Sequence, residues 1–166
     1  MFPDVGTERW SHYEIEYMAD KGVVTGYPDG SFKPLQNLTR SEFAALIYRF
    51  TGVEEPTIDN PFPDVTEDHW AYKEILALKE AGLVLGDGDG NYRPEDNITR
   101  AEAMTVINKL LGRKPLDSYV KSLDLNPFND LNDKNEWYYV AVLEATITHN
   151  YYLNDTDYEY KWEDLK

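Results

Sequence analysis

Cysteine is absent from this sequence, and that absence excludes several kinds of stabilising and reactive site. Without thiols the chain can form no disulfide, no thiolate metal site and no cysteine nucleophile. Long apolar stretches are absent too, because no run approaches the roughly 20 apolar residues that span a bilayer. Membrane insertion is therefore not expected of this chain.

Basic residues are scarce. The chain has 16 Lys and Arg against 31 Asp and Glu, for a formal net charge of −15, and no basic cluster offsets this balance. Polyphosphate partners need a basic face, so nucleic-acid binding is not expected. The same charge argues against binding to an anionic membrane surface.

Catalytic motifs are missing as well. His12, His69 and His149 are not spaced as metal ligands, and the sequence has no nucleophile elbow, phosphate loop or zinc motif. Glycoside hydrolysis requires a pair of carboxylates, but with 31 Asp and Glu in the chain such a pair can be chosen anywhere and is no evidence of this activity. The sequence predicts a binding module, with no enzyme activity, no cofactor and no metal site.

One acidic stretch has the spacing of a calcium loop. Asp87, Asp89 and Asn91 match the first three ligand positions of such a loop. The twelfth position requires an acidic residue and is Ile98, and the first repeat has Tyr27 where the second has Asp87. We therefore interpret this stretch as a turn.

An internal repeat is the dominant feature of the sequence. Residues 2–52 and 62–112 share 19 identities in 51 positions at one constant offset. A third copy begins at Phe128 and keeps Trp137, but it loses the glycine turn and the second half. We expect repeat 1 over residues 1–55, repeat 2 over 56–114, and a linker helix with a degenerate repeat 3 over 115–166. Units of this length bury their apolar faces against one another.

Each full repeat predicts two helices joined by a turn. First helices are expected at residues 10–21 and 70–81, ending at Gly22 and Gly82, where a helix C-terminus favours a left-handed residue. Second helices are expected to begin at Thr39 and Thr99, with helical apolar spacing after them. A short amphipathic helix is expected within residues 112–127. The fold class is thus mainly α, built from helix-loop-helix repeats with little or no strand.

The motif Thr-Arg-x-Glu occurs in both full repeats. Thr39 with Glu42, and Thr99 with Glu102, form the pattern of a capping box, in which each side chain bonds the other's backbone amide. These four residues are predicted structural helix caps. The box leaves the intervening arginine unexplained, because the helix dipole disfavours positive charge in the first turn.

Two roles for Arg40 and Arg100 follow from their chemistry. Free amides and the dipole at a helix N-terminus attract anions, and a guanidinium adds a bidentate grip on a carboxylate or phosphate. Alternatively, each arginine forms a salt bridge to an acid of a neighbouring repeat, such as Asp4 or Asp64.

The ordered motifs resemble those of S-layer homology repeats. The resemblance rests on Phe-Pro-Asp-Val, a tryptophan five residues later, a turn of the form Gly-Tyr-Pro-Asp-Gly-Ser-Phe-Lys-Pro and the start Thr-Arg-Ala-Glu, for which repeat 1 has Ser41 in place of Ala. It covers residues 2–52 and 62–112, and only the first half matches in residues 128–150. It implies three repeats packed as a pseudo-threefold helical assembly.

The resemblance also implies a function. Such repeats anchor extracellular proteins to Gram-positive cell walls by binding a secondary cell-wall polysaccharide, often pyruvylated, in grooves between repeats. The ligand-binding positions it implies are Arg40, Arg100, Trp10, Trp70, Asp4 and Asp64, although Trp10 and Trp70 could equally be core residues. Because the third copy lacks the arginine, at most two sites of this kind are expected.

Location and context follow as expectations. The start of the chain has no signal segment, and the first repeat begins at residue 2. We expect an extracellular fragment without its signal peptide, located at the cell wall and fused to other extracellular domains. The alternative function is a structural or protein-interaction module for surface-layer assembly, with weak or no glycan binding.

Overall fold

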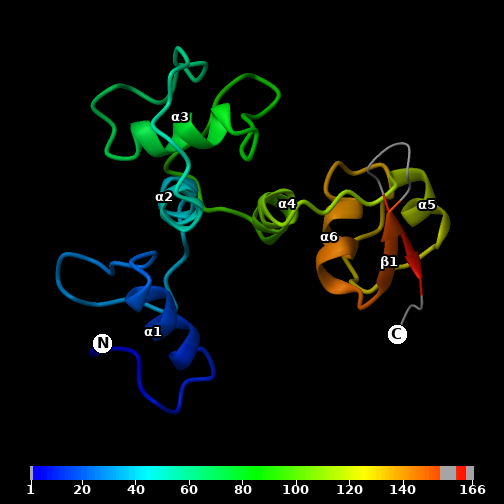
Figure 1. The fold of residues 1–166 in the computed structure, drawn as a ribbon, viewed down its shortest axis with the longest axis horizontal. Coiled ribbons are helices and arrows are strands. Elements are labelled where there is room, and N and C mark those ends of the chain that lie inside the picture. The colour runs from blue at the N-terminus through cyan, green and yellow to red at the C-terminus, as the bar shows by residue number, and fades with distance from the viewer. Residues whose placement is uncertain (1, 154–159, 164–166) are drawn as a thin grey trace. The chain divides into compact units, whose positions relative to one another are not determined.

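The computed structural model describes residues 2–153 and 160–163, with side chains up to His149. The chain divides into two compact units, residues 1–98 and 99–166. Helices and loops make up almost all of the described structure (Figure 1), so the predicted mainly α class is confirmed. No described helix is long and apolar enough to cross a membrane. The pseudo-threefold arrangement and the repeat boundaries stay predictions.

The first helices of the two full repeats are α1 (His12–Asp20) and α3 (Tyr72–Glu80). Each is shorter than predicted at both ends, because the residues around the tryptophan form turns and Ser11 provides no side-chain cap. Gly22 and Gly82 both have φ of 72°, the left-handed conformation predicted for them. These glycines end both helices, because other residues adopt that conformation only at a cost.

The second helices are α2 (Arg40–Thr51) and α4 (Arg100–Leu110). Both have the complete capping box that the sequence predicts, with Thr39 and Thr99 at the N-cap. The Thr39 amide donates to Glu42 Oε2 at 2.8 Å, and the Glu42 amide donates to Thr39 Oγ1 at 3.1 Å. The other Glu42 oxygen accepts from the Tyr27 hydroxyl at 2.8 Å. Partial burial and this bond raise the pKa of Tyr27 to about 12.

The same pair of hydrogen bonds joins the start of each full repeat to the loop that follows its first helix. Asp4 accepts hydrogen bonds from the amides of Phe32 and Lys33, at 2.9 and 2.7 Å. Asp64 accepts from the equivalent amides in repeat 2 at the same two distances. The second amide of each pair belongs to a residue with positive φ, 57° at Lys33 and 58° at Arg93. Each carboxylate thus holds a backbone conformation that is otherwise unfavourable.

The helices pack between repeats rather than within them. In the first unit α2, from repeat 1, packs against α3, from repeat 2. In the second unit α4, from repeat 2, packs against α6 (Tyr139–Thr146), the first helix of the third copy. Small buried residues allow the first of these contacts to be close: Ser41, Ala44 and Ala45 on α2, and Ala77 on α3. Among the described elements, α1 packs against none of the others.

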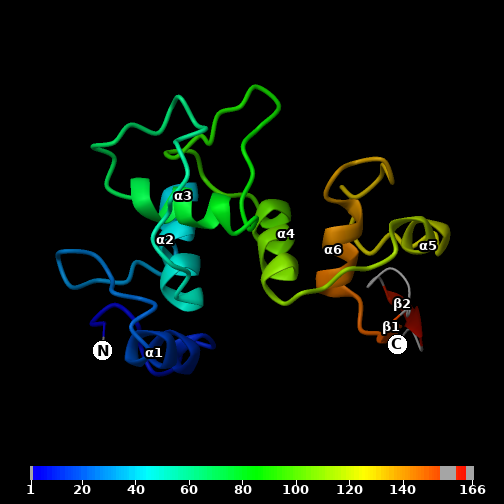
Figure 2. The ribbon, with the colours of Figure 1, turned by 45° about the horizontal axis from the view of Figure 1, so that its top comes forward.

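The third copy has its own small core. The predicted linker helix is present as α5 (Asp117–Ser122), which packs against α6. Two strands then pair antiparallel, β1 (Asn150–Leu153) and β2 (Tyr160–Glu163), as Figure 2 shows. The sequence analysis did not predict this hairpin. The buried core residues of this unit come from α5, α6 and the segment between them: Val120, Leu131, Tyr139, Val140, Val142 and Leu143.

Asp4 makes the stability of repeat 1 dependent on pH. The amide of Phe32, followed by that of Lys33, holds the pKa of Asp4 below its usual value. A depressed pKa stabilises the folded state above the unfolded value of about 3.9, and this contribution is lost as the pH falls through the folded pKa. We expect Asp4→Asn to be less stable than the parent at neutral pH, and the two to converge on acidification.

Urea unfolding at several pH values measures this convergence. The exposed residue Asp20 provides the matched control, because Asp20→Asn removes the same charge without touching the loop. Parallel stability curves for the parent and Asp4→Asn across the acid range contradict the assignment.

Candidate functional site

The Arg40 side chain is buried in the contact between repeats 1 and 2, with 8% of the residue exposed. Its Nε donates to the Tyr92 carbonyl at 2.7 Å, and its Nη2 lies 3.5 Å from the Leu85 carbonyl. The guanidinium carbon also lies 4.8 Å from the centre of the Tyr92 ring. The Tyr92 hydroxyl donates back to the Arg40 carbonyl at 3.1 Å. Arg40 therefore connects the start of α2 to the loop of repeat 2.

The backbone at the start of α2 is engaged in the same contact. The amide of Arg40 donates to the Asp96 carbonyl at 2.8 Å, and the amide of Ser41 donates to the Pro94 carbonyl at 3.0 Å. The Ser41 hydroxyl also donates to the Pro94 carbonyl, at 2.9 Å. These carbonyls satisfy the amides that an anion would otherwise bind at this helix terminus.

Arg100 has the same place in its motif and a different environment. Its side chain is exposed, and within the described part of the chain it has no hydrogen bond or ion pair. Arg40 is held by the loop of repeat 2, and the third copy has no counterpart of that loop. Among the described residues, therefore, no carbonyl accepts from the amides of Arg100 and Ala101. The capping box of Thr99 and Glu102 is nonetheless intact. This helix terminus is therefore chemically open to an anion.

The tryptophans are surface residues. Trp10 is 85% exposed and Trp70 is 56% exposed, so neither is a core residue. Trp137, the equivalent residue of the third copy, is also largely exposed and stands edge-on to Tyr138, with ring centres 5.3 Å apart. Tyr138 packs against the core of the second unit, as does Ala101 at the start of α4. Trp137 was absent from the predicted site residues, although its alignment with Trp10 was visible in the sequence.

Asp4 and Asp64 face their own loops. Both oxygens of each carboxylate accept from backbone amides of the same repeat, as described above. Their positions thus support a role in shaping the loop that carries Tyr92 or its counterpart Phe32.

The acidic stretch of repeat 2 is a turn, as interpreted from the sequence. Asp87 Oδ1 accepts from the amides of Asp89 and Asn91, both at 2.9 Å. These bonds, the Asn91 amide foremost, lower the pKa of Asp87. Within the described residues no group of three or more acidic, histidine or cysteine side chains is arranged to hold a metal ion.

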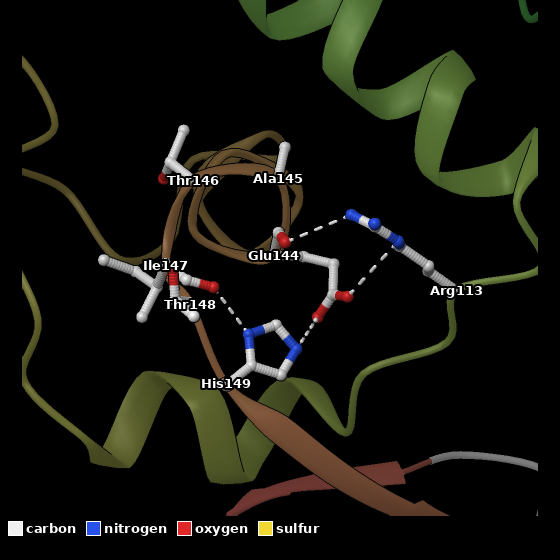
Figure 3. A pocket seen from close by; sticks show the side chains of 7 residues that line it. All are labelled: Arg113, Glu144, Ala145, Thr146, Ile147, Thr148 and His149. Carbon is white, nitrogen blue, oxygen red and sulfur yellow. Dashed lines mark hydrogen bonds and ion pairs between the residues drawn. The ribbon is translucent and has the colours of Figure 1, made fainter. Parts of the chain in front are cut away.

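A pocket lies at the C-terminal end of α6 (Figure 3) and is lined by Arg113 and by residues 144–149. The buried Glu144 carboxylate lies 3.4 Å from His149 Nε2 and 3.9 Å from Arg113 Nε. His149 Nδ1 lies 2.7 Å from the Ile147 carbonyl, and Arg113 Nη1 lies 3.4 Å from the Glu144 carbonyl. A polar cluster thus joins α6 to the segments that follow α4 and α6.

The comparisons with known proteins decide the family. The S-layer homology domain model matches residues 2–44 and 61–104, which is slightly more than half of the chain. The chain belongs to the S-layer homology family. The two matched segments are the two full repeats, and each match ends inside the second helix of its repeat.

Several curated proteins are similar over much of the chain. A cellulosome-anchoring protein of Acetivibrio thermocellus is 34% identical over 169 residues, covering 99% of this chain and 36% of its own length. S-layer protein EA1 of Bacillus anthracis is 33% identical over 134 residues, covering 80% of this chain and 15% of its own. An endoglucanase of Bacillus sp. (strain KSM-635) is 39% identical over 107 residues, covering 63% of this chain and 11% of its own. The chain thus spans about a third or less of these relatives.

The two motif arginines should differ in their effect on stability. Arg40→Ala removes the charge-assisted hydrogen bond to the Tyr92 carbonyl and the longer contact with the Leu85 carbonyl, so we expect it to lower the free energy of unfolding of the first unit by about 2–3 kcal/mol. Arg100→Ala removes no bond within the described residues, so we expect a change within about 0.5 kcal/mol. Urea unfolding of both variants measures the difference, and equal losses contradict it.

Glu144 should be essential to the second unit. Glu144→Ala leaves the buried His149 ring and the Arg113 guanidinium without the carboxylate that both contact, and an unsatisfied buried polar group costs about 1–3 kcal/mol. Hydrogen exchange of the α6 amides measures the loss, which should be far smaller for the exposed control Glu136→Ala. Unchanged protection of α6 in Glu144→Ala would show that the cluster is not stabilising.

Proposed function

We propose that this chain is a non-catalytic module that anchors a longer protein to the bacterial cell surface by binding an anionic cell-wall polysaccharide. The observation that carries the proposal is the open N-terminus of α4, where an exposed Arg100 lies beside unengaged amides. Family membership supports the anchoring role, since relatives include a cellulosome-anchoring protein and an S-layer protein. The extracellular location of the chain is part of this proposal.

The chemistry of the α4 terminus suits a carboxylate on a sugar, such as a pyruvate ketal. The positive end of the helix dipole and free amides favour an anion, and the guanidinium can bind both carboxylate oxygens. The exposed ring of Trp137 belongs to the same unit and offers an apolar face on which a sugar ring can stack. Since the net charge of −15 repels anions at long range, recognition depends on these local groups.

The three other groups of predicted site residues receive different roles in this proposal. Arg40 maintains the contact between repeats, since its side chain and amide already bind carbonyls. Asp4 and Asp64 shape the loops through backbone amides. Trp10 and Trp70 remain proposed stacking residues because their rings are exposed. The sequence predicted at most two polysaccharide-binding sites built on a motif arginine. Since Arg40 is engaged, the proposal keeps one of them, at Arg100.

Fusion to other domains is also proposed. The chain matches only 11% of an endoglucanase and 36% of a cellulosome-anchoring protein, so the same repeats occur beside other segments in those relatives. We infer that catalytic or scaffolding activities of the full protein, where present, lie outside this chain.

Cosedimentation with purified wall sacculi tests the proposal. We expect the chain to pellet with intact sacculi and to remain soluble with sacculi stripped of polysaccharide. Arg100→Ala should weaken binding by about 10- to 100-fold, the loss of one or two charge-assisted hydrogen bonds. Lys114→Ala is the matched control, because it removes one exposed positive charge from the same unit.

The outcomes separate the two candidate functions. Equal pelleting with intact and stripped sacculi would overturn polysaccharide binding and favour the alternative, a module for surface-layer assembly. Equal weakening by Arg100→Ala and Lys114→Ala would show that bulk charge, and not the α4 terminus, governs binding. A loss on Trp137→Ala that exceeds the loss on Trp10→Ala would support the placement of the sugar beside α4.

A further inference from the structure

Residues 94–98, the entry segment, lead directly into the N-cap of α4 and are held by the start of α2. The Pro94 carbonyl accepts from the Ser41 amide at 3.0 Å and from the Ser41 hydroxyl at 2.9 Å. The Asp96 carbonyl accepts from the Arg40 amide at 2.8 Å. Proline has no amide hydrogen to donate, so its carbonyl is the one backbone group through which Pro94 can be hydrogen-bonded. The first half of the entry segment is thus fixed to α2.

The second half of the entry segment pairs with the residues that precede α2. The Ile98 amide donates to the Leu38 carbonyl at 2.9 Å, and Asn97 forms an antiparallel bridge with Thr39. Every one of these hydrogen bonds lies within the first unit, which ends at residue 98. Thr99, the N-cap of α4, is the next residue of the chain, so no unbonded linker separates it from the entry segment.

The order of the entry segment matters to the proposed anion site because that site consists of the first turn of α4. Thr99 is extended, with φ of −80° and ψ of 158°, the non-helical conformation that is typical of an N-cap. The Arg100 and Ala101 amides follow it directly. Helix termini fray readily, and a ligand that must first order a terminus binds more weakly than one that meets a formed terminus. A fixed residue before Thr99 reduces that cost.

Ser41 alone gives the entry segment two hydrogen bonds, one from its amide and one from its hydroxyl. It is fully buried, with 0% of the residue exposed. Its counterpart in repeat 2 is Ala101, which has no hydroxyl. The hydroxyl is therefore a feature of the first motif that the second lacks, and it strengthens the hold on the residues that precede the second helix of the next repeat.

We propose that the start of α2 positions the anion site at the start of α4, with Ser41 as the positioning residue. The role in binding rests on the proposed function at Arg100, whereas the mechanism rests on hydrogen bonds within the first unit. Repeat 1 thus contributes to the affinity of a site whose ligand-binding groups belong to repeat 2. Because coupling is reciprocal, a ligand at the start of α4 also stabilises the contact between α2 and the entry segment.

Hydrogen exchange without ligand tests the positioning directly. The Glu102 and Ala103 amides are the reporters of cap formation, since they donate to the Thr99 hydroxyl and carbonyl. Ser41→Leu enlarges a fully buried side chain and displaces the entry segment. Ala44→Leu is the matched control, because Ala44 is equally buried, lies on the same helix and has no hydrogen bond to the entry segment within the described structure.

We expect Ser41→Leu to bring exchange of both reporter amides to within about twofold of the rate of an unstructured chain. Ser41→Ala removes only the hydroxyl, so it should accelerate exchange by about two- to tenfold, the loss of one hydrogen bond. This milder variant decides the outcome if Ser41→Leu does not fold. Ala44→Leu should leave exchange within about twofold of the parent rate.

Binding to intact wall sacculi measures the consequence for the site. Ser41→Leu should weaken binding by about twofold or more, because the apparent affinity falls with the fraction of molecules in which the cap is formed. Ala44→Leu should bind as the parent does. In the parent, polysaccharide released from the same sacculi should slow exchange of the Ile98 amide, and it should not do so in Arg100→Ala.

Unchanged exchange of the reporter amides in Ser41→Ala and in folded Ser41→Leu overturns the proposal. Equal acceleration by Ser41→Leu and Ala44→Leu overturns it as well, because the effect then reflects the stability of the first unit. Faster exchange with undiminished binding of Ser41→Leu to sacculi shows that cap formation does not set the affinity, and it has the same consequence. If the parent itself does not bind sacculi, the proposed function fails, whereas exchange without ligand still decides whether α2 positions the start of α4.

Discussion

The contact between the start of α2 and the loop of repeat 2 is the interaction on which the first unit depends. Arg40 and Ser41 place two amides, a guanidinium and a hydroxyl on carbonyls of residues 85–96. Tyr92 and Pro94 are buried, so without these donors their carbonyls would be left unsatisfied, at a cost of about 1–3 kcal/mol each. The contact thereby couples the helix of one repeat to the fold of the next, and neither repeat is a complete unit by itself.

The loop can serve as an acceptor only because its own shape is held in place. Asp64 binds the amides of Tyr92 and Arg93, and positive φ at Arg93 turns the chain there. The Phe62 and Tyr92 rings, 5.4 Å apart, pack beneath this turn. The motif Phe-Pro-Asp-Val and the helix cap are therefore linked physically, although about 30 residues separate them in sequence. The Phe-Pro-Asp-Val motif shapes the loop, and the capped start of the helix from the preceding repeat binds that loop.

The third copy shows what happens when the receiving loop and the cap are both lost. Its first helix, α6, is still covered by α4, but the turn is replaced by β1 and β2. The buried Glu144 and His149, with the exposed Arg113 beside them, join the end of α6 to the segment that follows α4. The loss has a consequence at the start of α4. Within the described residues, no loop carbonyl accepts from the Arg100 side chain, which stays exposed.

Much of the fold was predictable from the sequence because it depends on local signals. The capping boxes at Thr39 and Thr99, the helix-ending glycines and the short helix after residue 112 all follow from residues within one or two turns of each other. The family followed from motif order. The hairpin β1–β2 was missed because its tail has no counterpart in the other repeats, and the motif alone could not distinguish Arg40 from Arg100. Only the tertiary structure makes that distinction, because each guanidinium is buried and hydrogen-bonded only if the loop of the next repeat offers it carbonyl oxygens.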